Sequence, residues 1–183
     1  MKKILYFLSI VVFVGCVSSI PKVKQFQELD VDTVQNHNKD FSIEIPKDWY
    51  PYYEYHHLIA YSPRKYKKEV ESKNINVYLT VFSDVSSKNI DEELSSYLEK
   101  MSKSYKNFGY KTIDAKHSDY GKYYIVKYRV QEKEKIYLAM RATILHNHKM
   151  YGFYYLALEK EFDNYLVDVI KTINSLKIKN DVK

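Results

Sequence analysis

The stretch INVYLTVFSDVSSKNIDEELSSYLEKM, residues 75–101, contains the change of pattern that decides the fold class. Its first eight residues alternate with the two-residue period of a β-strand. One face of that strand would carry Ile75, Val77, Leu79 and Val81, and the other face Tyr78 and Phe82. Since both faces carry large apolar side chains, we expect the sheet to be covered on both sides.

The second half of the same stretch predicts a helix. Asn89 can cap it, with Glu92 at the third helical position, and acidic residues follow where they favour the positive end of a helix. One apolar stripe at helical spacing would pack on the sheet: Leu94, Leu98, Met101 and Tyr105. Capping explains the acidic residues at 91–93 better than catalysis does.

The rest of the chain from residue 28 extends this pattern. Residues 30–35 and 41–46 predict a hairpin around the turn-forming NHNKD, and four more strands are expected at 110–117, 122–131, 135–145 and 150–159. Apolar residues at helical spacing between 161 and 179 predict a terminal helix. The sequence therefore predicts an α+β fold, a mostly antiparallel sheet with helices covering both faces.

The N-terminus has the composition of an export signal. Lys2 and Lys3 precede an apolar run from Ile4 to Val14, which is too short to span a bilayer. The run ends in Phe13, Val14, Gly15 and Cys16, which resembles the lipobox of bacterial lipoproteins. That resemblance implies cleavage before Cys16 and attachment of lipid to its thiol, and enough acyl chain for stable anchoring.

These features predict three segments: a lipoprotein signal peptide at 1–15, a lipidated tether at 16–27 and one folded domain at 28–183. We expect the protein in the bacterial cell envelope, anchored to a membrane through lipid on Cys16, with the domain outside the cytoplasm. Cleavage would remove two lysines and lower the net charge of +6 by two. An exported, mildly basic chain of this kind has no evident nucleic-acid partner.

Several segments together resemble the PsbP-like fold. They are FSIEIPKDW, the Ser62–Pro63 pair, NINVYLTVF, IDEELSSYLEKM, KMYGFYYLALEKEFDNY and VIKTINSLK. That superfamily includes photosystem II extrinsic subunits, Ran-binding Mog proteins and envelope lipoproteins of the DcrB family. The resemblance covers most of the chain from residue 30 to 178 and implies an α/β/α sandwich. It also implies a role in partner binding or assembly, although fold alone does not transfer function.

Motifs for catalysis and metal binding are weak. Ser62 to Lys65 spells S-x-x-K, but the other two motifs of the penicillin-interacting enzymes are incomplete, and no G-x-S-x-G, P-loop or H-E-x-x-H occurs. His146 and His148 could share a face at a hairpin turn, yet surface histidines explain them better than a metal site. We therefore expect no enzyme activity, no catalytic residue, no metal and no cofactor.

Two functional hypotheses remain. The leading one is a non-enzymatic, lipid-anchored envelope protein whose domain binds a protein partner for assembly or stabilisation. The alternative is a carrier that holds an apolar ligand in an aromatic-lined pocket between sheet and helix. The basic run RKYKK, 64–68, reads as a solvated loop, with attraction to anionic lipid headgroups as its functional interpretation.

The aromatic stretch WYPYYEYHH, residues 49–57, is the most prominent candidate surface. We expect Trp49 to pack into the core and a strand to run from Tyr55 to Tyr61. Between them Tyr50, Tyr52 and Tyr53 surround Pro51 in a predicted loop. Because tyrosine suits a surface that is apolar on one side and wet on the other, these three tyrosines are the candidate partner-binding residues.

Overall fold

A computed structural model describes residues 40–55, 58–72, 74–105 and 108–179 of the 183-residue chain. The predicted signal peptide, Cys16, the predicted tether and the strand predicted at 30–35 lie outside these residues. None of the helices in the described ranges is long and apolar enough to cross a membrane.

The centre of the molecule is one seven-stranded sheet in which every neighbouring pair is antiparallel. Its order is β2-β3-β4-β8-β7-β6-β5, so β2 and β5 form the two edges. The strands are β2 Trp49–Tyr55, β3 Leu58–Pro63, β4 Val77–Val85, β5 Tyr110–His117, β6 Gly121–Glu132, β7 Lys135–His146 and β8 Lys149–Leu158. The four strands predicted after the first long helix are thus confirmed as β5 to β8.

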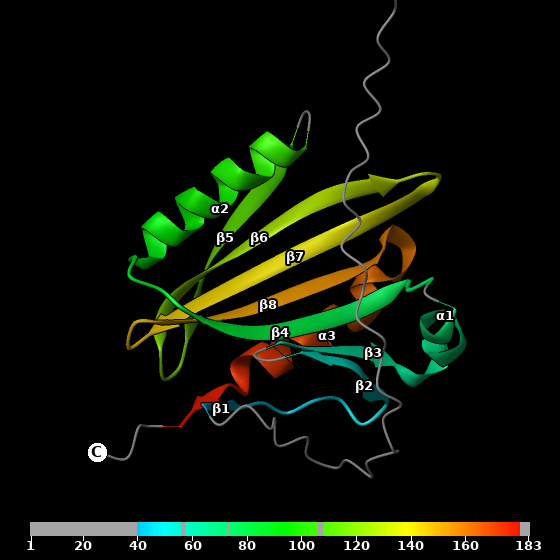
Figure 1. Ribbon diagram of the computed structural model, residues 1–183, viewed down its shortest axis with the longest axis horizontal. Coiled ribbons are helices and arrows are strands. Elements are labelled where there is room, and N and C mark those ends of the chain that lie inside the picture. The colour runs from blue at the N-terminus through cyan, green and yellow to red at the C-terminus, as the bar shows by residue number, and fades with distance from the viewer. Residues whose placement is uncertain (1–39, 56–57, 73, 106–107, 180–183) are drawn as a thin grey trace, which may run out of the picture.

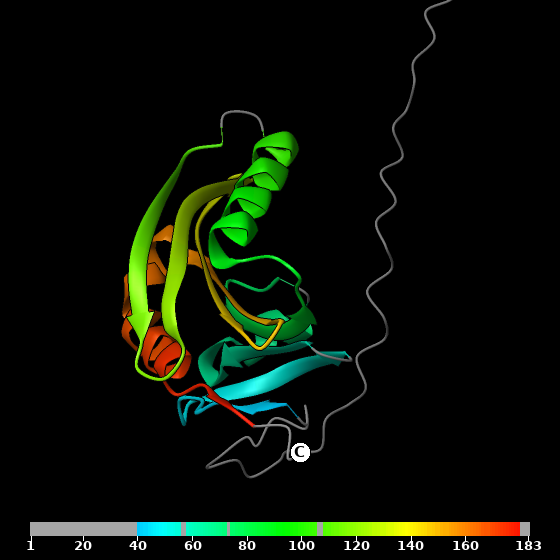
Figure 2. The same cartoon turned by 90° about the vertical axis from the view of Figure 1, so that its left-hand side faces the viewer.

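Two long helices cover opposite faces of this sheet, as Figures 1 and 2 show. They are α2, Ile90–Ser104, and α3, Phe162–Asn174. A short α1, Lys67–Glu71, follows the 3₁₀ turn η1, Arg64–Tyr66, and η2, Glu159–Glu161, leads into α3. The predicted α+β sandwich is therefore confirmed.

The main core lies between the sheet and α3. From the helix it receives Phe162, Tyr165, Val169 and Ile173, all buried. Trp49 is only 4% exposed and meets Tyr165 edge to face at 5.7 Å between ring centroids, so its expected packing role is confirmed. A two-stranded sheet of β1, Phe41–Ser42, and β9, Lys177–Ile178, closes one end of this core.

The opposite face packs a smaller cluster beneath α2. Leu94, Leu98 and Met101 contact it, whereas Tyr105 at the end of the predicted stripe is 46% exposed. The helix begins with the predicted capping box, since the Asn89 side chain accepts from the Asp91 and Glu92 amides and Glu92 accepts from the Asn89 amide. Burial of one stripe and a satisfied first turn together fix α2 on the sheet.

Two local predictions were wrong. Residues 64–68 form η1 and the start of α1 rather than a loop. Within that run the Lys65 ammonium lies 3.4 Å from a Glu161 carboxylate oxygen and over the Tyr66 and Tyr165 rings. In the predicted strand at 41–46 only Phe41 and Ser42 pair, and their partner is the C-terminal β9, a long-range contact that local patterning does not reveal.

Candidate functional site: an aromatic face beside the edge strand β2

The stretch around Pro51 is a strand and not the predicted loop. Tyr50 pairs with Ser62 and Tyr53 with Ala60, with a register shift between Pro51 and Tyr53. The expected strand from Tyr55 to Tyr61 is split between β2 and β3, and His56 and His57 lie outside the described residues. A bulge and a proline are usual on an edge strand, where the missing ladder partner leaves room for both.

The pairing also fixes where these tyrosines face. Tyr53, Ala60, Thr80 and Tyr154 lie opposite one another across β2, β3, β4 and β8. Directly paired residues share a face of a sheet, so this row belongs to the α2 side. Figure 1 shows α2 lying over the β5 end of the sheet and not over β2, β3 or β4. Neither of the two long helices covers this part of the face, and the short α1 lies near Tyr50.

We call this surface the aromatic face and define it by six residues: Tyr50, Tyr52, Tyr53, Tyr78, Phe82 and Tyr154. All six are half-buried. Tyr78 and Tyr154 lie with ring centroids 5.9 Å apart. The Tyr52 hydroxyl lies close enough to Tyr78 to contribute to the raised pKa of Tyr78. The structure therefore places the three predicted tyrosines beside rings from β4 and β8.

A series of tyrosine hydroxyls continues from this face to the space under α2. Tyr97 of α2 donates to the Tyr128 hydroxyl at 2.8 Å, and Tyr128 and Tyr154 also interact through their hydroxyls. The strand between them contributes Ala139, which is fully buried and pairs with Tyr128. Because alanine is small, the two tyrosines can meet across β7.

Arg141 closes the aromatic face on the side of α2. Its guanidinium carbon lies 4.2 Å from the Tyr97 ring centroid and 5.4 Å from that of Phe82. Its Nε donates to Thr143 Oγ1 at 3.3 Å. A cation between two rings attracts both of them, and this contact joins α2 to the β4 part of the face.

Four tyrosines of the aromatic face have raised pKa values, so their hydroxyls remain protonated at neutral pH. Burial raises the pKa of Tyr50 to about 12, with a further contribution from Glu71 and Glu69. Burial also raises the pKa of Tyr52, Tyr78 and Tyr154. Neutral hydroxyls on large rings donate and accept hydrogen bonds, which suits recognition of another molecule.

The β2–β3 hairpin also contains unused hydrogen-bonding capacity. Trp49 Nε1 and the hydroxyls of Tyr50 and Tyr61 are buried and have no hydrogen-bond partner among the described residues. A buried polar group left without a partner costs about 1–3 kcal/mol, so such groups are uncommon. The β2–β3 hairpin contains three such groups, so it has hydrogen-bonding groups that a bound partner can satisfy.

One cavity lies beneath α2, between residues such as Leu94 and Tyr124, and its volume is about 10 Å³. This is about the space of one water molecule, far below the several hundred cubic ångströms of a ligand pocket. The size of this cavity weighs against a carrier that holds its ligand between the sheet and α2.

The remaining predicted candidates do not converge on a site. His146 packs against the Tyr120 ring at 5.1 Å, and His148 is exposed at the turn that follows β7. Within the described ranges, no three histidine, cysteine, aspartate or glutamate side chains gather as metal ligands would. Cys16, the predicted lipidation site, lies outside those ranges.

Sequence reasoning missed Tyr78, Tyr154, Phe82 and Arg141 as members of one surface. Alternation within β4 indicated that Tyr78 and Phe82 share a face. The strand order, which is not evident from the sequence, places β8 next to β4 and places β2 two strands from β4 on the other side. Tyr154 alternates in the same way within β8, and that signal was present in the sequence.

No family model and no curated protein matches this sequence. Solved structures do match in shape. Cyanobacterial PsbP (CyanoP) from Synechocystis sp. PCC 6803 is 9% identical, with a TM-score of 0.55, covering 76% of this chain and 86% of that one. LpqN, involved in cell envelope biogenesis of Mycobacterium tuberculosis, is 10% identical, with a TM-score of 0.53, covering 76% and 83%.

A third match is the Saccharomyces cerevisiae Ran-binding protein Mog1p, 9% identical with a TM-score of 0.53, covering 79% of this chain and 93% of that one. Identities this low establish the fold alone. The architecture is an α/β/α sandwich around an antiparallel sheet. More particularly, it is the PsbP-like fold, as the sequence resemblance implied.

Proposed function

We propose that this protein is a non-enzymatic, lipid-anchored envelope protein that binds a protein partner through the aromatic face and the edge strand β2. The observation that supports this most strongly is the half-buried row of tyrosines on a part of the sheet that α2 leaves uncovered. Large rings with polar tips are the side chains that contribute most to protein interfaces.

The size of the cavity under α2 supports partner binding over ligand carriage, because this cavity is too small for an apolar ligand. The fold neighbours are consistent with the proposal: one is a Ran-binding protein and another is involved in cell envelope biogenesis. The resemblance of residues 13–16 to a lipobox supports the anchor.

Lipidation of Cys16 is tested by metabolic labelling with an alkyne-bearing fatty acid. The chain with its native Cys16 should take up label, and Cys16→Ala should not. An unlabelled native chain, or label that persists in Cys16→Ala, would contradict the anchor.

Partner binding is tested by affinity recovery from detergent-solubilised envelopes with Tyr53→Ala. This variant should lose a stoichiometric partner while keeping its unfolding midpoint, since the Tyr53 ring is half-buried on an edge strand. Tyr110→Ala on the opposite edge strand, where the ring is 50% exposed, is the matched control and should retain the partner. Equal recovery with both variants would refute the assignment of the site.

A further inference from the structure

An open groove lies at the end of the sheet where β7 turns into β8. Its volume is about 270 Å³. The turn, the start of α2 and the start of β6 enclose it with nine residues: Ser86, Lys88, Asn89, Ile90, Lys122, Leu145, His146, Asn147 and His148. Figure 1 shows these segments together at the left-hand end of the molecule.

The lining of this groove is basic. Lys88 and Lys122 contribute to it, together with His146 and His148, and no carboxylate does. The pKa of Lys122 is raised, chiefly by its contact with Tyr124, so its ammonium stays charged. The Lys122 ammonium lies 3.7 Å from the Asp91 carboxylate oxygen Oδ1. That carboxylate also accepts from the Tyr124 hydroxyl, so it offsets Lys122 only in part.

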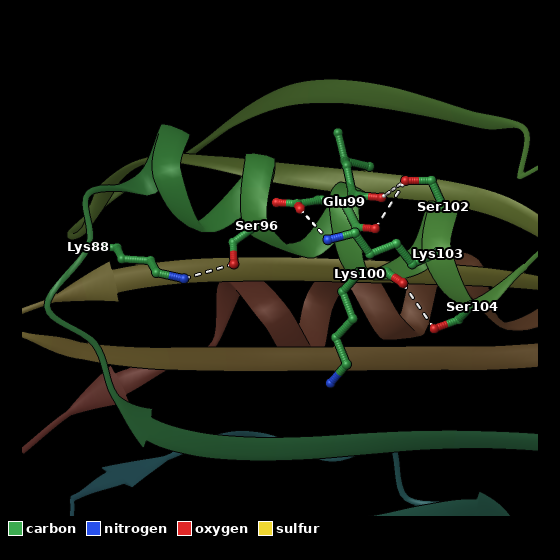
Figure 3. Close-up of polar contacts among 8 residues, drawn as sticks. Lys88, Ser96, Glu99, Lys100, Ser102, Lys103 and Ser104 are labelled. Carbon is green, nitrogen blue, oxygen red and sulfur yellow. Dashed lines mark hydrogen bonds and ion pairs between the residues drawn. The ribbon is translucent and has the colours of Figure 1, made fainter.

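The Lys88 ammonium is held by a neutral hydroxyl and lies near enough to Glu99 to lower the pKa of that carboxyl, and a phosphate oxygen is a stronger acceptor than the hydroxyl. Its Nζ donates to Ser96 Oγ at 2.8 Å on the outer surface of α2, as Figure 3 shows. The first turn of α2 is already capped by the Asn89 side chain. The positive character of the groove therefore comes from side chains and not from the helix amides.

The turn between β7 and β8 exposes the side chains of Asn147 and His148. Asn147 and His148 both have left-handed backbone conformations, with φ of 48° and 59°. A two-residue hairpin turn of this kind favours glycine at its second position, and here the position holds an exposed histidine. The chain thus carries an imidazole at a position where glycine would avoid backbone strain.

The groove lies close to the first described residue of the domain. Asp40 is the first described residue, and its carboxylate oxygen Oδ2 lies 2.9 Å from the ammonium nitrogen of Lys149. Lys149 directly follows His148 of the groove. The described part of the chain therefore begins beside this groove. If the proposed anchor at Cys16 is correct, the groove lies next to the described residue that is nearest to the anchor along the chain.

We propose that the groove binds the phosphate of an anionic phospholipid headgroup, with Lys88 and Lys122 as the principal contacts. This inference rests on the proposed membrane anchor for its biological setting. Two ammonium groups and two imidazoles line this open groove, and the ammonium groups complement the charge of a phosphodiester although Asp91 lies beside Lys122 and Glu93 accepts from Ser86. The contact would orient the tethered domain so that the aromatic face, further along the sheet, stays accessible to a partner.

The test is co-sedimentation of the non-lipidated chain, residues 17–183, with vesicles of phosphatidylcholine with and without phosphatidylglycerol. Binding should require phosphatidylglycerol. Lys88→Gln with Lys122→Gln should weaken it roughly 10- to 30-fold, the effect of removing two lysines near an anionic surface. Lys111→Gln with Lys160→Gln is the matched control, since both lysines are exposed, have the same charge and lie outside the groove and the basic run at 64–68. That control should weaken binding less than about threefold.

Equal losses in the two double variants would show general electrostatic attraction and overturn the proposal. Inorganic phosphate is added as a competitor. If it abolishes vesicle binding at concentrations well below that of the vesicle lipid, the groove is a site for free phosphate and the lipid assignment is overturned. Because the test uses a chain without Cys16, its failure leaves the lipid anchor and the Tyr53 interface to their own experiments.

Discussion

Replacing Gly152 with alanine tests how closely the aromatic face is packed. Gly152 lies in β8 opposite Phe82 of β4, and the Phe82 ring covers it. A Cβ at this position would be 2.1 Å from Phe82 Cζ and 2.5 and 2.6 Å from Cε2 and Cε1. Carbon atoms in contact are about 3.5–4.0 Å apart, so the ring must move by more than about 1 Å.

The expected cost follows from that displacement. Extra carbon in a packed site costs about 1–3 kcal/mol. The Phe82 ring is half-buried and can tilt outward, but doing so loses its contact with Arg141, whose guanidinium lies 5.4 Å from the ring centroid. We therefore expect Gly152→Ala to lower the free energy of unfolding by about 2 kcal/mol.

Urea unfolding of the non-lipidated chain, followed by circular dichroism, measures this loss. In a Phe82→Ala background the same Gly152→Ala change should cost little, giving a coupling energy of at least about 1 kcal/mol. Gly109→Ala is the matched control, because a Cβ there meets no heavy atom within 4 Å. An unchanged stability of Gly152→Ala, or an equal loss in both backgrounds, would refute the packing argument.

Three further predictions concern α2 and its contacts. Asn89→Ala removes the capping box and should lower the free energy of unfolding by about 1 kcal/mol in urea; no loss would mean that the first turn is stabilised otherwise. Tyr128→Phe leaves the Tyr97 hydroxyl without its acceptor and should cost about 1 kcal/mol, whereas a neutral result would show that Tyr97 finds another partner. The Tyr124 hydroxyl and Lys122 hold the pKa of Asp91 in the folded protein below its usual value of 3.8. The stability that the Asp91 carboxylate contributes is therefore complete above pH 3.8, and it is lost as the pH falls through the pKa of the folded state. Asp91→Asn should therefore destabilise the fold at neutral pH and progressively less in acid, and a pH-independent difference would contradict this.

The sequence predicted most of the sheet because its signals are local. In β4 the alternation of Val77, Leu79 and Val81 with Tyr78 and Phe82 predicts both the strand and the apolar side chains on each of its faces. In α2 the Asn89 cap and the spaced leucines give both the start and the packed side. These patterns depend only on neighbours within a few residues.

The candidate site was harder to predict because it depends on contacts between distant residues. Tyr53 and Tyr154 share a face only because β3 and β4 lie between β2 and β8 in the sheet order. Pro51 made the tyrosine stretch look like a loop, yet an edge strand tolerates proline where a central strand does not. The basic run at 64–68 looked solvated because Glu161, the partner of Lys65, is almost a hundred residues further along.

The most direct test of the proposed function is site-specific photocrosslinking in the native envelope. A benzophenone amino acid at position 53 would report on β2, and the same residue at position 110 would report on the opposite edge, β5. The proposal predicts one crosslinked protein of defined mass from position 53, absent from position 110 and identified by mass spectrometry. No adduct at position 53, or the same adducts at both positions, would contradict partner binding through the aromatic face.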